Sequence, residues 1–224
     1  MLQSTNRAQH PLDRPIGRGR SDVSLSAFAY LFSELVQYHQ NRVLSIQDLE
    51  LRLEQAGRDV GARCFEILSF REIEGGRGGV GGGRGMKRET RILGILQFIS
   101  TTLWRSLFSK PATSLEKSMD SDQEFMIHDA SPPTNMYVSL PPDLGGLNTA
   151  SYISGIVEGV LNSSGFDAKV TAHTVKGGSG GGLDTEDGNN GGNGGNGGGY
   201  VRDKTVFLVR FTKEVMERDA ALER

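Results

Sequence analysis

The stretch Ala56-Gly57-Arg58-Asp59-Val60-Gly61-Ala62-Arg63, residues 56–63, decides the fold of this chain. Its two glycines are four residues apart, and apolar residues recur at helical spacing on both sides of the stretch. Glycine here can supply a left-handed turn residue, or it can let a second backbone approach where a side chain would block it. We therefore expect Gly57 to end one helix and Gly61 to lie in the first turn of the next, at the tightest point of the fold.

Glycine elsewhere marks where the packed structure stops. Two tracts, at residues 74–86 and 177–199, hold most of the 31 glycines of the chain. Segments of this composition bury too little apolar surface to fold, so both are expected to be disordered loop insertions. Part of the first tract matches the G-x-G-x-x-G pattern. A helix and not a strand precedes that match, so it does not indicate nucleotide binding.

The length and composition fit one soluble domain. The 224 residues carry a formal net charge of −2, which gives no sign of a nucleic-acid-binding surface. We expect a disordered basic tail at residues 1–20 and a single α+β domain at residues 21–224. Cys64 is the only cysteine, so no intramolecular disulfide can form. The polar N-terminus and the short apolar segments predict a cytoplasmic protein that meets membranes only peripherally.

Periodicity predicts an α+β fold. Apolar residues at intervals of three and four predict helices at 24–40, at 45–57, from 59 to the first glycine tract, and at 87–108, 148–163 and 213–222. Alternating and β-branched segments predict strands at 124–128, 135–140, 166–175 and 205–211. Helices segregated from a small antiparallel sheet favour an arrangement with the helices on one face. The last two strands are expected to pair as a hairpin across the second glycine tract, since the entropy of loop closure grows slowly with length.

The residue pattern offers no catalytic or metal site. The histidines have no second ligand at helical or loop spacing, and they are His10, His39, His128 and His173. Cys64 falls on an apolar helical face, which is typical of an inert core thiol. Glu158 is assigned to a solvated helix face, and no paired carboxylates or triad are evident. We expect no catalytic residue, no cofactor and no metal.

The helix at 24–40 has a wider apolar arc than one core-facing stripe requires. Phe28, Phe32 and Val36 are expected to face the core of the domain itself. Other apolar residues of this helix and the next are expected to form a hydrophobic partner interface, and they are Ala27, Leu31, Leu35, Tyr38, Leu49 and Leu53. The first helix is therefore expected to be buried on more than one side, by its own domain and by a partner.

Six segments carry a resemblance to a known family. They are SLSAFAYLFSELVQ at 24–37, GRDVGAR at 57–63, KRETRILG at 87–94, GIVEGVL at 155–161, GFDAKVTAH at 165–173 and RDAALE at 218–223. The chain resembles the small core subunits of the TRAPP complex, the multisubunit tether and Rab activator of the early secretory pathway, in the branch of its fifth subunit. The family signature maps onto the turn with Gly57, Gly61 and Arg63, and the other segments match the branch. Together they cover nearly all of the chain outside the tail and the glycine tracts.

The resemblance implies an α+β fold in which a twisted four-stranded antiparallel sheet has helices packed on one side. This is the fold of the TRAPP small subunits and of NO-signalling and Golgi-transport ligand-binding domains. It also implies a place in a hetero-oligomer, beside the acylated central paralogue and a longin-type subunit, at cis-Golgi and endoplasmic reticulum membranes. The implied function is a non-catalytic scaffold in the core that promotes nucleotide exchange on a Rab-type GTPase in ER-to-Golgi transport.

The chain departs from the family pattern in two places. The loops that hold the glycine tracts are short in relatives, so partner contacts made by those loop tips are not carried over. The acylated relative binds its lipid through a cysteine beyond the glycine-pair motif, whereas Cys64 directly follows Arg63, so acylation is not carried over either. The alternative interpretation is a small-molecule or lipid-binding module of the same fold superfamily, with a cavity between helices and sheet.

Overall fold

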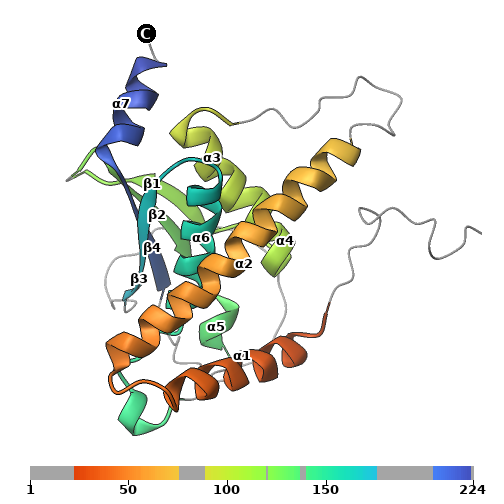
Figure 1. The fold of residues 1–224 in the computed structure, drawn as a ribbon, viewed down its shortest axis with the longest axis vertical. Helices are drawn as coiled ribbons and strands as arrows, with labels where there is room; N and C mark the ends of the chain where they lie inside the picture. The colour runs from red at the N-terminus through yellow and green to blue at the C-terminus, as the bar shows by residue number, and fades with distance from the viewer. Residues whose placement is uncertain (1–22, 76–88, 120, 137–139, 176–203, 223–224) are drawn as a thin grey trace, which may run out of the picture.

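The structure is a computed structural model, and it describes residues 23–75, 89–119, 121–136, 140–175 and 204–222 (Figure 1). The basic tail expected at 1–20 and almost all of both glycine tracts lie outside these residues. The described elements are, in order, α1 (Leu25–Gln40), α2 (Ile46–Gly75), α3 (Ile92–Phe98), the π-helical turn η2 (Ile99–Leu103), α4 (Trp104–Phe108), β1 (Ser114–Lys117), β2 (Glu124–Asp129), α5 (Pro133–Met136), the 3-10 turn η3 (Pro142–Leu144), α6 (Ser151–Ser163), β3 (Ala168–Val175), β4 (Lys204–Phe211) and α7 (Lys213–Ala221).

The four strands form one antiparallel sheet in the order β1-β2-β4-β3. β3 and β4 pair along their length with Val170 opposite Val209, as expected for a hairpin across the second glycine tract. Side chains alternate along β4, so that Phe207, Val209 and Phe211 are buried on one face. α6 packs on this face beside α3, η2 and α4. The α+β fold with a four-stranded antiparallel sheet and helices packed on one side is therefore confirmed.

The membership of the sheet differs from the prediction in one strand. The predicted strand at 135–140 is wrong, because Pro133–Met136 form the single helical turn α5, and residues 137–139 lie outside the described part. The fourth strand is instead β1, which pairs with β2 at the edge of the sheet. β1 has only four residues and ends in two exposed charged ones, so it is too short for an alternating pattern to reveal it.

The predicted helix break at Gly57 is also wrong. α2 is one continuous helix, and both Gly57 and Gly61 lie inside it. Its start follows the expected capping pattern, because the Ser45 hydroxyl accepts the N–H of Asp48 at 3.1 Å. A glycine inside a helix costs up to about 1 kcal/mol relative to alanine. The two glycines therefore need a compensating contact elsewhere in the fold.

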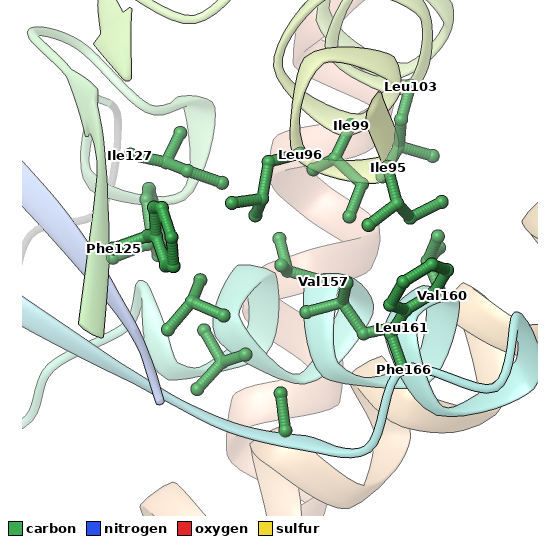
Figure 2. Close-up of a cluster of buried hydrophobic side chains, with 14 of the residues drawn as sticks. Ile95, Leu96, Ile99, Leu103, Phe125, Ile127, Val157, Val160, Leu161 and Phe166 are labelled. Carbon is green, nitrogen blue, oxygen red and sulfur yellow. The ribbon is translucent and has the colours of Figure 1, made fainter. Parts of the chain in front are cut away.

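The buried apolar side chains form two clusters. The larger cluster lies between the sheet, α3, η2 and α6, and Figure 2 shows Leu96 of α3 pointing toward Ile127 of β2 and Val157 of α6. The smaller cluster lies between α1, α2 and the segment before α6, and it includes Phe32. Tyr152 packs against both clusters. α1 and the first half of α2 are thus joined to the rest of the fold by continuous packing.

A buried carboxylate at the end of β2 joins the sheet to α4 and to the segment after it. Trp104 is fully buried, and its Nε1 donates to Oδ2 of Asp129 at 3.0 Å. Nζ of Lys110 donates to Oδ1 of the same carboxylate at 2.9 Å and to the Ser131 carbonyl at 2.9 Å. Burying a carboxylate is tolerated when its oxygens are paired in this way. The end of β2 is therefore held in place against the helix layer.

Candidate functional site

Four glycines hold α2 and α6 at backbone contact. Two come from each helix, one turn apart, and they are Gly57, Gly61, Gly155 and Gly159. A Cβ atom on Gly61 would overlap the carbonyl group of Ile156, and one on Gly155 would overlap the carbonyl group of Glu54. These obstacles are main-chain atoms, which cannot rotate away as a side chain can. The two helices therefore pack more closely than side chains would permit, as small residues one turn apart allow.

The expectation that Gly61 admits a second backbone is confirmed, and the role of Gly57 is corrected from helix end to helix contact. The partner glycines on α6 repeat the same four-residue spacing. That repeat is the sequence signal that could have identified them. Arg63, the third residue of the expected signature, is exposed on α2. The arginine of this stretch that bonds to α6 is Arg58, whose role the sequence analysis did not predict.

A network of four charged side chains lies beside the glycine contact. Arg58 of α2 donates to Oε1 of Glu158 at 2.8 Å, and Lys169 of β3 lies 2.7 Å from Oε2 of Glu54. Lys169 is also 3.3 Å from Glu158, and Arg58 is 3.5 Å from Glu54. Glu158 is 6% exposed, so its assignment to a solvated face is wrong. Two carboxylates and two cations balance each other where α2, α6 and β3 meet.

Side chains of α6 and of the segments next to it also cover part of one edge of the sheet. β3 is one of the two edge strands, with β1 at the opposite edge, and three of its outward backbone groups bond to side chains instead of another strand. Three bonds follow one another: Ala168 N–H to Asn162 (3.2 Å), Val170 N–H to Glu158 (3.0 Å) and Asn148 Nδ2 to the Ala172 carbonyl (2.7 Å). A backbone group occupied in this way is not available to pair with a strand from another chain.

The inner side of α1 belongs to the core of the domain. Phe32 and Val36 are buried against α2, and Phe28 is half-buried beside them, as expected. Leu35 was expected at the partner interface, but it is half-buried and packs against the same cluster. Leu35 therefore lies at the boundary between the core and the exposed side of the helix.

Two residues that were expected at the partner interface are buried in the core of the domain. Leu49 and Leu53 of α2 are 1% and 0% exposed, and they pack with Phe32 and Val36 in the smaller cluster. A side chain without exposed surface cannot contact a partner, so their assignment to the interface is wrong. The spacing of apolar residues led to the wrong assignment because α1 and α2 each carry more than one apolar stripe. A pattern within one helix does not say which stripe the neighbouring helix covers.

The outer face of α1 is exposed and mostly apolar, with the exposed Glu34 between its apolar side chains. We use this name for Ala27, Tyr30, Leu31 and Tyr38, which lie along one side of the helix. Leu31 is 72% exposed, Tyr30 79% and Tyr38 51%. Tyr30 was not among the expected interface residues, although its spacing of three from Ala27 placed it on that side. Large apolar side chains gathered on one exposed face are typical of surfaces that bind proteins, membranes or ligands.

Cys64 is a packed thiol. It is half-buried against the larger cluster, and burial raises the pKa of the thiol. A raised pKa leaves less thiolate at a given pH, and the thiolate is the reactive form. We expect iodoacetamide at mildly alkaline pH to alkylate the folded chain about tenfold more slowly than the chain in concentrated urea. Mass spectrometry of the single adduct measures both rates, and equal rates would contradict the packed position.

The described residues hold no group of three or more His, Cys, Asp or Glu side chains placed to bind a metal ion. In the same part of the chain, none of the helices combines the length and the apolar content that crossing a bilayer requires. Within the described residues, the features that remain for function are the glycine contact, the charged network beside it and the outer face of α1.

A small α+β domain with an apolar helix face left exposed has the architecture of a subunit that associates with other proteins. The family model "Transport protein particle (TRAPP) component" matches residues 28–191, which is more than half of the chain. The chain therefore belongs to the TRAPP component family. The match includes the glycine contact, the charged network and most of α1.

Similar proteins point to one branch of this family. The chain is 41% identical over 209 residues to trafficking protein particle complex subunit 5 of Dictyostelium discoideum, which covers 93% of this chain and 96% of the relative. The human subunit 5 is 41% identical over 212 residues, covering 95% and 93%. Subunit 31 of Saccharomyces cerevisiae is 25% identical over 250 residues, covering 89% and 80%. The similarity to the subunit 5 branch thus extends over nearly the whole chain.

A solved structure supports the fold. The structure of trafficking protein particle complex subunit 3 from Naegleria fowleri, covalently bound to palmitic acid, aligns with a TM-score of 0.58. The alignment covers 84% of this chain and 95% of that one, at 15% identity. At this identity the likeness concerns the fold alone, and the palmitic acid belongs to the Naegleria protein.

Proposed function

We propose that this chain is a non-catalytic scaffold subunit of the TRAPP vesicle-tethering complex. In this proposal it helps to build the core that promotes nucleotide exchange on a Rab-type GTPase in ER-to-Golgi transport. Its family and the names of its relatives, which are subunits of a trafficking complex, support this role. The observation that carries the proposal is the outer face of α1, where large apolar side chains are exposed although the inner face of the same helix is packed.

The proposed partners are other TRAPP core subunits, first the acylated central paralogue and then a longin-type subunit. The Rab-type GTPase, and the cis-Golgi and endoplasmic reticulum membranes, would be reached through the assembled complex. Covering Leu31 and the two tyrosines of the outer face would remove large apolar areas from water. Each such side chain contributes about 1.5–3 kcal/mol when fully buried. A handful of such residues is enough to dominate the affinity of an interface.

Replacing Leu31 and Tyr38 together by aspartate is expected to remove the chain from the complex. Two charges on the outer face would have to be desolvated by the partner, which costs more than the apolar contact gains. A tagged wild-type chain should co-purify with the other TRAPP subunits, and Leu31→Asp with Tyr38→Asp should not. The complex is also purified through a tag on another TRAPP subunit, with the wild-type chain or the double variant present, and assayed for nucleotide release from the Rab-type GTPase, which should slow when the chain is missing.

The matched control is Leu93→Asp with Met119→Asp. These residues are also exposed and apolar, at 57% and 102%, but they lie outside α1. The control should co-purify as the wild type does, and thermal unfolding should show that both double variants are folded. Retention of the α1 double variant in the complex would contradict the interface. Unchanged nucleotide release in a complex lacking the chain would contradict the scaffold role.

A small-molecule or lipid-binding module remains the second candidate function, and one observation favours it. A hollow of about 510 Å³ adjoins the N-terminal half of α1, and not the expected space between helices and sheet. Its lining among the described residues is Leu25, Ser26, Ala29, Tyr30 and Ser33. A mass above that of the bare chain in native mass spectrometry would support this function. The bare mass alone would leave the hollow as a seat for a partner's side chain.

A further inference from the structure

Basic side chains gather at one end of the outer face of α1. We call this cluster the basic elbow, and it consists of His39 near the C-terminal end of α1, Arg42 just after that helix, and Arg52 in the second turn of α2. Figure 1 shows α1 and α2 meeting at the turn between them. Both arginines are exposed, and His39 is half-buried. A partner on the outer face of α1 would have this cluster beside it.

Direct contacts join the basic elbow to the apolar face. The guanidinium carbon of Arg42 lies 3.5 Å from the ring centroid of Tyr38, and its Nη1 donates to the Tyr38 carbonyl at 2.7 Å. A cation over an aromatic ring is held there by the quadrupole of the ring. The ring of His39 meets the same tyrosine edge-on, with 5.2 Å between centroids. A molecule that covers Tyr38 must therefore also meet Arg42.

The basic side chains of the elbow lie near enough to one another for their charges to interact. Burial, and then the charges of Arg52 and Arg42, hold the pKa of His39 below its ordinary value. Within the described residues, no ion pair joins either arginine to a carboxylate. The nearest carboxylates along the two helices are Glu34, Asp48, Glu50 and Glu54. Glu50 already accepts the N–H of Asn148 at 2.7 Å, and Glu54 pairs with Lys169 at 2.7 Å. Like charges held together without a partner repel one another in the free chain.

We propose that the protein docking on the outer face of α1 carries carboxylate side chains that bind the basic elbow. This rests on the proposed function, because it describes the chemistry of the partner at the same surface. The partner would present an apolar centre to Leu31 and Tyr38 and acidic residues at one end. The apolar contact then supplies most of the affinity, while the charged contact raises the association rate and fixes the orientation.

The arrangement favours a protein over an anionic lipid surface. Helices that lie on membranes carry lysines and arginines along the length of their polar face. Here the basic residues are confined to one end of α1, and Glu34 lies on the exposed side of the helix, one turn before Tyr38. A membrane would meet this carboxylate together with the apolar residues. A protein surface with charges at one end matches the pattern better.

The test compares charge reversal with loss of the apolar contact. The probe is the purified TRAPP subunit 3 of the same organism, called here the subunit-3 paralogue. It stands for the acylated central paralogue of the proposed function, because the Naegleria subunit 3 is covalently bound to palmitic acid. Its Kd for the chain is measured at about 50 mM and about 500 mM salt, where screening differs strongly. Arg42→Glu with Arg52→Glu should weaken binding about tenfold or more at low salt, and much less at high salt. The wild type should lose affinity as salt is raised. Arg105→Glu is the control, because Arg105 is an exposed arginine on α4.

Each outcome decides between the hypotheses. If charge reversal leaves the Kd unchanged at both salt concentrations while Leu31→Asp with Tyr38→Asp abolishes binding, the docking surface stands and the acidic partner is wrong. If charge reversal removes binding only to phosphatidylserine vesicles and not to the subunit-3 paralogue, the elbow binds lipid and the inference is overturned. A wild-type chain that binds no subunit-3 paralogue contradicts both the inference and the proposed partner.

Discussion

Gly61→Ala is expected to lower the free energy of unfolding by about 2–4 kcal/mol, and Gly61→Leu to leave no folded chain. At an ordinary helix position, replacing glycine by alanine stabilises by about 0.5–1 kcal/mol, so even the sign of the change is informative. The added methyl group would overlap the carbonyl group of Ile156 in α6. Because that obstacle is main chain, α2 and α6 would have to move apart. Their separation would also weaken the contact between Arg58 and Glu158.

Gly94→Ala is the matched control for this prediction. Gly94 also lies inside a helix, and a methyl group there would also overlap another atom. The obstacle in that case is the carboxylate at the end of the flexible Glu89 side chain, which can turn away. The change should therefore stay within about 1 kcal/mol. Urea unfolding followed by circular dichroism measures both variants. Equal losses at Gly61 and Gly94 would show that the α2–α6 contact is not the tightest point of the fold.

The sequence predicted those elements whose pattern is local and regular. α1, α6, β3 and β4 each repeat apolar residues over two or more turns or several alternations, so periodicity alone found them. It failed where a distant contact overrides a local preference. The local sequence around Gly57 favours the end of a helix. In the folded chain α2 continues through this position and packs against α6, and only glycine fits against the Tyr152 carbonyl there. The four-residue strand β1 is stabilised by pairing with β2, and that pairing leaves no local signal.

The sequence likewise predicted the parts of the candidate site that depend on a local pattern, and not the parts that depend on distant contacts. The excess apolar surface of α1 is visible in the sequence, and Leu31 and Tyr38 are indeed exposed. The burial of Leu49 depends on where α1 lies against α2, which no pattern within α2 specifies. The role of Glu158 depends on three elements that meet only in the folded chain. A carboxylate on a helix face predicts solvent exposure unless its partners, here Arg58 and Lys169, are known.

Glu158→Ala is expected to lower the free energy of unfolding by about 2–3 kcal/mol. Removing one member of a buried charged pair costs about 3–5 kcal/mol when both charges are fully buried. The cost here is smaller, because the side chain of Arg58 is 26% exposed and that of Lys169 is 51% exposed. The substitution also takes the acceptor from the N–H of Val170, which lies on the edge of the sheet. The N–H left without an acceptor accounts for part of this expected loss in the free energy of unfolding.

Two measurements separate this role of Glu158 from a general loss of packing. Hydrogen exchange at the amide of Val170 should become faster in Glu158→Ala, more than at amides inside the β2–β4 ladder, because the edge bond is gone. Glu217→Ala is the control, since Glu217 forms an exposed pair with Lys213 on α7 and its loss should cost less than about 0.5 kcal/mol. If both variants lost the same stability, or if the Val170 amide exchanged no faster, Glu158 would not be the residue that joins α2, α6 and the edge of the sheet.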